Sequence, residues 1–274
     1  MYTDFYGLHE KPFNVTSDPN FLFFSQTHKD AFSHLSYGIK ERKGFIAITG
    51  EIGAGKTTLC RALLNQLEEN TKTAFILNPS LSGIQLLEAI LEDFGLKPEK
   101  KNKIVLFRQL NKFLLNELKV GHNVIVIIDE AQNIKNSLLE EIRMLSNLET
   151  EKEKLFQIIL VGQPQLNNKL NSPALVQLRQ RIAVRCHITS LAKDEIGPYV
   201  HHRLKVAGSA GDIEFTGAAI EKLFIYSNGI PRLLNLLCDR AMLMGYVRKL
   251  RTFTEEIIEE SIAEIEGAMH KVSV

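Results

Sequence analysis

Phosphate-binding chemistry is the clearest signal in this sequence. One run fits the pattern G-x-x-x-x-G-K-[ST], and it consists of Gly50, Glu51, Ile52, Gly53, Ala54, Gly55, Lys56, Thr57 and Thr58. The glycines allow the backbone to curl so that successive N–H groups point at a phosphate, and a following helix adds the partial positive charge of its N-terminus. In such a loop Lys56 reaches the β- and γ-phosphates, and the hydroxyl of Thr57 is a ligand for Mg²⁺. The run therefore predicts a nucleoside triphosphate site.

An acidic pair, Asp129 and Glu130, directly follows the β-branched run of residues 124–128. Such a run is typical of a strand that is buried on both faces. A carboxylate at the end of this kind of strand holds the Mg²⁺ shell in phosphate-loop ATPases, and Asp129 fits that role. Glu130 could then polarise the attacking water as a general base. The alternative is that both carboxylates only cap the strand end and the next helix, which the phosphate loop earlier in the chain argues against.

Polar and cationic side chains follow at three further points. Gln163 leaves an expected strand over residues 156–161 and could orient the water or respond to hydrolysis. Arg179 and Arg181 precede the last expected strand, where arginines can reach a γ-phosphate that a neighbouring subunit holds. We favour Arg181 of the two because it directly precedes an apolar residue, although each could be an ordinary surface arginine. Arg232 opens a helix near the C-terminus and could lean onto the phosphates of its own subunit.

Strands and helices alternate through most of the chain, which predicts a parallel sheet covered by helices on both sides. Strands are expected at 44–49, 73–77, 124–128, 156–161 and 184–188. After residue 190 only helices are expected, at 193–206, 217–227, 231–248 and 255–269. We therefore place a nucleotide-binding domain in residues 1–189 and a helical domain in residues 190–274. Residues 1–26, rich in aromatic side chains, are expected to wrap over the first domain and bury them.

Composition suggests a soluble globular chain of 274 residues. It has 33 Lys and Arg against 32 Asp and Glu, a net charge of +1 that indicates no nucleic-acid or membrane partner. Cys60, Cys186 and Cys238 are widely spaced within apolar segments, so we expect small core side chains in a reducing compartment. The N-terminus lacks the pattern of a signal peptide, and the apolar run at 124–128 is too short to span a bilayer. We expect a cytoplasmic protein.

Together these motifs resemble AAA+ ATPases, and the chain is most similar to the general secretion pathway protein A (ExeA type) family with its short pilus-biogenesis and exopolysaccharide-locus relatives. The similarity runs almost end to end and is carried by residues 5–8, 11–13, 25–28, 37–39, 44–45, 49–60, 76–79, 127–132, 142–150, 157–166, 178–182 and 229–240. The resemblance implies an αβα core with a five-stranded sheet, a C-terminal helical lid, and ATP with Mg²⁺ as the bound nucleotide. It also implies a homo-oligomer that supports an envelope secretion, pilus or polysaccharide-export assembly, through a partner at the inner membrane.

The resemblance also suggests a role for Asn78, which ends an expected strand before Pro79. In the AAA+ strand order this strand lies beside the strand that carries Asp129. Asn78 could then hydrogen-bond Glu130 and hold it away from the water until a partner docks. It could equally satisfy the turn before the proline, and both interpretations stay open.

One departure from the family concerns the C-terminus. Longer relatives continue into a membrane-spanning helix and a peptidoglycan-binding region, which the sequence to Val274 does not contain, so direct cell-wall binding is not carried over. Two other functions share the core motifs: a DNA-dependent ATPase of the transposition-helper type, and a scaffold that binds ATP with little turnover. The near-zero net charge argues against the first and Glu130 against the second.

Overall fold

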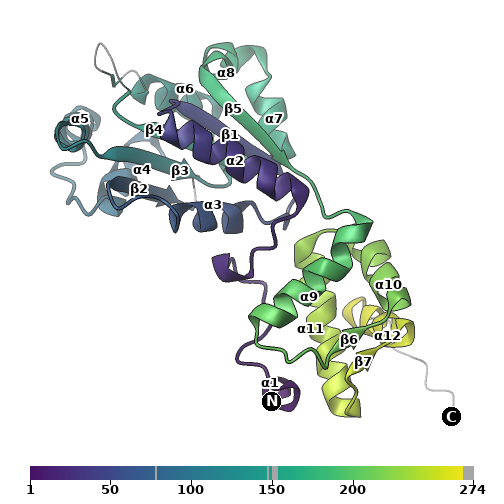
Figure 1. Cartoon of the computed structure of the whole chain (residues 1–274). Helices are drawn as coiled ribbons and strands as arrows, with labels where there is room; N and C mark the ends of the chain where they lie inside the picture. Colours follow the sequence, from purple (N-terminus) through teal and green to yellow (C-terminus); the bar gives the residue numbers. More distant parts are fainter. Residues whose placement is uncertain (78, 147, 150–153, 268–274) are drawn as a thin grey trace. The chain divides into compact units, whose positions relative to one another are not determined.

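The computed structural model describes residues 1–77, 79–146, 148–149 and 154–267. It confirms the expected α/β fold with a five-stranded parallel sheet (Figure 1). The chain divides into two compact units. The first unit, which we call the helical unit, contains Met1–Gln26, Glu51–Thr58 and Thr189–Val274, and the second, the sheet unit, contains Thr27–Gly50 and Leu59–Ile188.

The strands of the sheet unit are β1 (Phe45–Gly50), β2 (Thr71–Ile76), β3 (Asn123–Ile128), β4 (Gln157–Gly162) and β5 (Ile182–Ile188). Their spatial order is β2-β3-β4-β1-β5, and each neighbouring pair is parallel. The strand expected at 73–77 therefore lies beside the strand that leads to Asp129, as the resemblance to AAA+ ATPases implies. Because all five strands run in one direction, their carboxyl ends share one edge of the sheet, where polar residues can converge.

Helices cover both faces of this sheet (Figure 1). Successive strand residues point to opposite sides, and since both sets are apolar, both faces must be buried. Phe45 and Ala47 of β1 belong to a large apolar core with the helices that follow β2 and β3. Ile46 faces the other side, where a Cβ at Gly38 of α2 would lie only 2.8 Å from its Cδ1 atom. The helices between and around the strands are α2 (Gln26–Lys40), α3 (Lys56–Leu64), α4 (Gly83–Asp93), α5 (Lys103–Lys119), α6 (Asn136–Leu145), α7 (Pro164–Leu170) and α8 (Val176–Arg181), with the 3₁₀ helices η2 (Ala131–Asn133) and η3 (Pro173–Leu175).

The C-terminal helices form close to the ranges that the sequence predicts, with one addition; the last helix ends at Ile265, and the prediction for residues 268–269 lies outside the described residues. The helices are α9 (Ile196–Val206), α10 (Gly217–Ser227), α11 (Pro231–Arg248) and α12 (Glu255–Ile265), preceded by the 3₁₀ helix η4 (Lys193–Glu195). Two short strands, β6 (Glu214–Phe215) and β7 (Thr252–Phe253), pair in parallel between them. The sequence predicts no strand here, because a strand of two residues is too short to show an alternating pattern.

The N-terminal segment groups with the helical unit and not with the nucleotide-binding domain in which the sequence places it. It contains α1 (Tyr2–Tyr6) and the 3₁₀ helix η1 (Pro19–Phe21). Tyr2, Tyr6, Phe13 and Phe21 are buried, but in the apolar core of α9 to α12, and Phe5 and Phe23 pack against the same core while partly exposed. The hydroxyl of Tyr6 donates to the carbonyl of Leu250 at 3.0 Å, and the N–H of His9 donates to the carbonyl of Ala207 at 2.8 Å. Contacts between segments this far apart in sequence leave no local pattern.

Two further predictions concern the burial of the cysteines and the membrane-spanning potential of the helices. All three cysteines are buried and carry free thiols, as the sequence suggested. In the described part of the chain, every helix is too short or too polar to cross a membrane.

Candidate functional site

The phosphate-binding run forms a tight loop between β1 and α3, which begins at Lys56. Gly53 and Gly55 have φ values of 78° and 92°, in the left-handed region that favours glycine. The Lys56 side chain is nearly buried and its Nζ atom donates to the carbonyl of Glu51 at 2.8 Å, inside the loop. Ala54 is fully buried, and Ile52 is exposed. The loop thus has the curled backbone and the inward-turned ammonium group that a phosphate needs.

Within the helical unit the same loop contacts the start of α11. The backbone N–H of Arg232 donates to the carbonyl of Gly53 at 3.3 Å. A Cβ at Gly53 would lie 2.6 Å from Cβ of Arg232, so a larger residue at this position would collide with the helix. The structure therefore brings Arg232 to the phosphate loop of its own chain.

The sheet unit presents the acidic pair at the carboxyl end of β3. Asp129 is buried, and its N–H donates to the carbonyl of Ile76, the last residue of β2, at 2.9 Å. Its Oδ1 atom accepts the N–H of Glu130 at 2.8 Å. Glu130 itself adopts φ 52° and ψ 35°, a left-handed conformation that is uncommon for a residue with a side chain. Such local strain occurs often at functional sites.

The carboxylate of Glu130 is held by two amide side chains. Nε2 of Gln163, at the end of β4, donates to Oε2 of Glu130 at 3.1 Å, and Nε2 of Gln132 donates to the same oxygen. The oxygen Oε1 of Gln132 in turn accepts the N–H of Gln163 at 3.0 Å. The structure thus brings together Glu130 and Gln163, which the sequence had singled out separately. The expected partner of Glu130, Asn78, lies outside the described residues.

Two residues of this cluster were missed by the sequence analysis. Gln132 lies in the stretch 127–132 that carries the family resemblance, but no role was assigned to it, although its position two residues after Glu130 was a usable hint. Lys169 on α7 donates from Nζ to the carbonyls of Gln132 and Ile134, at 2.6 and 2.7 Å. These bonds fasten the loop after β3 to the helix after β4.

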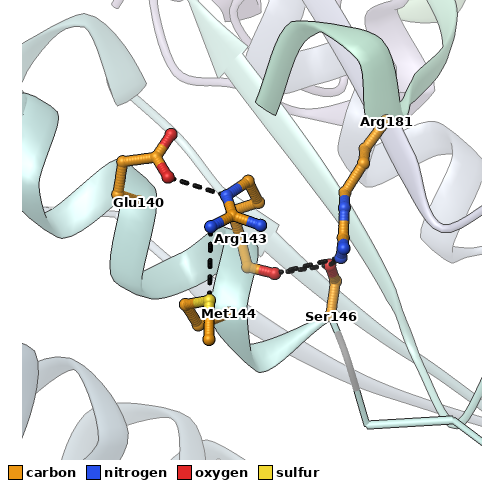
Figure 2. A network of polar contacts seen from close by, with 5 residues as sticks. All are labelled: Glu140, Arg143, Met144, Ser146 and Arg181. Atoms are coloured by element: carbon orange, nitrogen blue, oxygen red, sulfur yellow. Dashed lines mark hydrogen bonds and ion pairs between the residues drawn. The ribbon is translucent and has the colours of Figure 1, made fainter. Parts of the chain in front are cut away.

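The two candidate arginines of α8 differ in their surroundings. Nη1 of Arg181 donates to Oγ of Ser146 at 2.8 Å and to the carbonyl of Arg143 at 3.4 Å (Figure 2). Arg181 thus caps the C-terminal end of α6, where a cation is favourable. Arg179 is exposed and makes only a long 3.5 Å bond from Nη1 to the carbonyl of Asn171. The structure therefore fixes Arg181 within its own chain and leaves Arg179 accessible.

Positive charge gathers around these arginines. Burial lowers the pKa of Arg185, and the neighbouring Arg179 charge lowers it further. Burial and the Arg181 charge lower the pKa of Lys154 in the same way. Among the described residues, no carboxylate forms an ion pair with Arg179, Arg181 or Arg185, although Lys154 pairs with Glu149. An anion from outside the chain, such as a phosphate, would relieve this repulsion.

The residues present fit a nucleotide with Mg²⁺. The positive-φ glycines and the buried lysine suit a triphosphate, while the hydroxyl of Thr57 and the carboxylate of Asp129 are hard oxygen ligands of the kind that Mg²⁺ prefers. Within the described residues, no group of three or more His, Cys, Asp and Glu could hold a metal ion by itself.

Comparison with known proteins agrees with this architecture. The sequence profile of a family described as "AAA domain" matches residues 39–170. General secretion pathway protein A from Aeromonas hydrophila is 42% identical over 268 residues, which cover 97% of this chain and 49% of that protein. An uncharacterised HTH-type transcriptional regulator from Methanocaldococcus jannaschii is 28% identical over 170 residues, or 60% of this chain and 39% of that one. The chain thus spans about half or less of the length of these relatives.

Solved structures share the fold at low sequence identity. The ORC2 protein of Aeropyrum pernix superimposes with a TM-score of 0.69 at 16% identity, over 93% of this chain and 72% of that one. Cdc6p from Pyrobaculum aerophilum gives 0.67 at 14% identity, over 90% and 68%. We conclude that the chain has the P-loop nucleotide-binding fold, that its residues 39–170 match an AAA domain, and that it is related to general secretion pathway protein A.

Proposed function

We propose that this chain binds ATP with Mg²⁺ and hydrolyses it. The observation that carries the proposal is the position of Glu130, two residues after the end of β3, with its Oε2 atom 3.1 Å from the amide nitrogen of Gln163, which directly follows the neighbouring strand β4. An acceptor and a donor side by side at the carboxyl edge of a parallel sheet can orient one water molecule. The phosphate loop follows β1, whose carboxyl end lies at the same edge of the sheet.

In this proposal the loop residues 50–58 hold the phosphates through their N–H groups, and Lys56 neutralises the terminal phosphates. Thr57 and Asp129 hold Mg²⁺, which supplies charge neutralisation for the triphosphate. Glu130 accepts the proton of the attacking water, and Gln163 donates to the same water or to the γ-phosphate. A general base of this kind contributes about 10²- to 10⁴-fold in rate, or about 3–5 kcal/mol of barrier.

Arginines complete the proposed site. Arg232 serves the nucleotide of its own subunit, which its contact with Gly53 supports. An arginine of the next subunit in a homo-oligomer contacts the γ-phosphate. The sequence favours Arg181 for this role, but the bonds of Arg181 to Ser146 and Arg143 within its own chain favour Arg179, which is accessible. Asn78 remains a candidate restraint on Glu130.

The cellular role we propose rests on the relative's name. Similarity to general secretion pathway protein A supports a cytoplasmic ATPase that assembles or powers a secretion, pilus or polysaccharide-export system through an inner-membrane partner. Crosslinking of a Glu130→Gln variant in its native cell should capture a component of such an envelope assembly. Recovery of nucleic-acid-processing proteins alone would contradict this role and favour a DNA-dependent function.

Phosphate release from ATP tests the enzymatic proposal. Glu130→Gln should bind a fluorescent ATP analogue as tightly as the parent protein but hydrolyse ATP about 10²- to 10⁴-fold more slowly, because an amide cannot accept the proton. Glu92→Gln, an exposed carboxylate of α4, is the matched control and should behave as the parent. Unchanged hydrolysis by Glu130→Gln would show that the catalytic assignment is wrong.

A further inference from the structure

Gln132 makes two side-chain hydrogen bonds, one as a donor and one as an acceptor. Its Nε2 atom donates to Oε2 of Glu130, and its Oε1 atom accepts the N–H of Gln163 at 3.0 Å. One amide group therefore joins the loop after β3 to the end of β4. The fit is close, since a Cβ at the preceding Gly162 would lie 2.7 Å from Oε1 of Gln132.

The Glu130 carboxylate accepts both of its hydrogen bonds from amide side chains on one of its two oxygens. Gln132 and Gln163 both donate to Oε2, and within the described residues no hydrogen bond reaches Oε1. A carboxylate with one oxygen held by two amides has little freedom to rotate, and its second oxygen keeps a lone pair directed away from them. Oε1 is thus the atom that can accept a proton.

The backbone around Gln132 is also anchored. Lys169 donates to the carbonyl of Gln132 at 2.6 Å, and the N–H of Asn133 donates to the carbonyl of Glu130 at 2.9 Å. Glu130 itself is in the left-handed region, a conformation that persists only where surrounding contacts impose it. The backbone that carries the Gln132 side chain is therefore held in place by hydrogen bonds on both sides.

We propose that Gln132 is the positioning residue of the hydrolysis reaction: it fixes the Glu130 carboxylate and the Gln163 amide relative to each other so that both address one water molecule. The proposal rests on the proposed function, in which Glu130 is the general base. It assigns Gln132 no contact with nucleotide or water. Its loss should lower the rate of the chemical step and leave nucleotide binding unchanged.

Single-turnover hydrolysis, with protein in excess over ATP, tests this on two variants. Gln132→Met keeps the length of the side chain and removes both hydrogen bonds. Gln132→Glu keeps an acceptor for the N–H of Gln163, but it cannot donate to Glu130 and adds a negative charge beside it. Gln165→Ala, an exposed amide of α7, is the control. Each variant is also measured for its affinity for a fluorescent ATP analogue and for its melting temperature.

We expect Gln132→Met to slow hydrolysis about 10- to 100-fold, since a displacement of about 1 Å in a reacting group has this effect. Gln132→Glu should be slower still, while the affinity for nucleotide changes less than about twofold and Gln165→Ala matches the parent. In a Glu130→Gln background, Gln132→Met should cause no further loss, because no base remains to be positioned.

A merely structural role would reduce hydrolysis by the same factor in both backgrounds, and this result would overturn the proposal. Hydrolysis within twofold of the parent for both Gln132 variants would overturn it as well. Failure of the proposed function is seen separately, because Glu130→Gln alone would then hydrolyse ATP at the parent rate.

Discussion

The guanidinium group of Arg203 donates from Nη2 to the backbone carbonyl of Asn14 at 3.0 Å, and from Nε to the carbonyl of Pro12. Arg203 lies on α9 and is almost completely buried. Its guanidinium carbon also lies 4.8 Å from the ring centre of Phe21. One side chain of the helical unit thus satisfies two carbonyls of the N-terminal segment, so this segment is a structural part of that unit.

Replacement of this arginine should destabilise the protein. Arg203→Met keeps most of the apolar stem but leaves the buried carbonyl of Pro12 without its donor and removes the partly buried bond to Asn14, which should cost roughly 2–4 kcal/mol. Urea denaturation measures this loss. Arg240→Met removes an exposed arginine that pairs with Glu264 at 3.6 Å and should change stability by less than about 0.5 kcal/mol. Equal effects of the two substitutions would contradict a clamping role for Arg203.

A stabilising substitution is expected at the end of α11. Lys249 caps this helix with φ 57° and ψ 37°, and its side chain is exposed. Glycine adopts this conformation without the strain of a Cβ atom, so Lys249→Gly should raise the free energy of unfolding by about 0.5–1 kcal/mol. Lys249→Ala keeps the Cβ atom and serves as the control. If glycine and alanine were equivalent there, the left-handed cap would not be a source of strain.

Substitution of Arg181 should lower the stability of the protein, whereas substitution of Arg179 should lower its rate of ATP hydrolysis. Arg181→Ala removes the cap on α6 and should cost about 1 kcal/mol, whereas Arg179→Ala should leave stability unchanged within about 0.5 kcal/mol.

Under our proposal, Arg179→Ala binds ATP but hydrolyses it poorly. Mixing it with a Lys56→Ala protein, which retains Arg179, should restore part of the activity. A protein that stays monomeric with ATP, with turnover per subunit independent of concentration, would exclude a shared site.

Nucleotide binding itself should depend on Lys56. The ammonium group already points into the phosphate loop, so Lys56→Ala should abolish measurable binding of a fluorescent ATP analogue without unfolding the protein. Lys100→Ala, an exposed lysine of the loop before α5, is the control and should bind normally. Retained binding by Lys56→Ala would place the nucleotide elsewhere.

Stability should fall at alkaline pH, and the helical unit provides the reason. Burial raises the pKa of Tyr6 to about 12, and burial together with the bond to Asp239 raises the pKa of Tyr2. Burial also raises the pKa of Cys238. The unfolded chain loses these protons near pH 8.5–10, below the folded pKa values, so unfolding releases protons and becomes easier as pH rises from about 9. Urea denaturation from pH 7 to 11 should show this decline, with a shallower slope for Tyr2→Phe. A flat profile would contradict it.

Local patterns in the sequence determined the fold class and the candidate loop. The spacing from Gly50 to Thr58 defines a phosphate loop by itself, and the runs at 124–128 and 156–161 are apolar enough to identify buried strands. These features are visible because backbone conformation and burial on two faces follow from neighbouring residues. For the same reason Glu130 and Gln163 stood out, each as a polar residue directly after such a strand.

The tertiary structure alone decided which of these residues meet. Nothing in the sequence paired Gln132 with both Glu130 and Gln163, or showed that Arg181 would bind the end of α6. The aromatic residues of the N-terminal segment predict that it is buried, but not against which part of the protein. In the structure it belongs to the helical unit, where Arg203 donates to the carbonyl of Pro12. Periodicity reports the face on which a side chain is buried. The residue that this side chain contacts depends on the packing of segments that are far apart in the chain, and no local pattern encodes that packing.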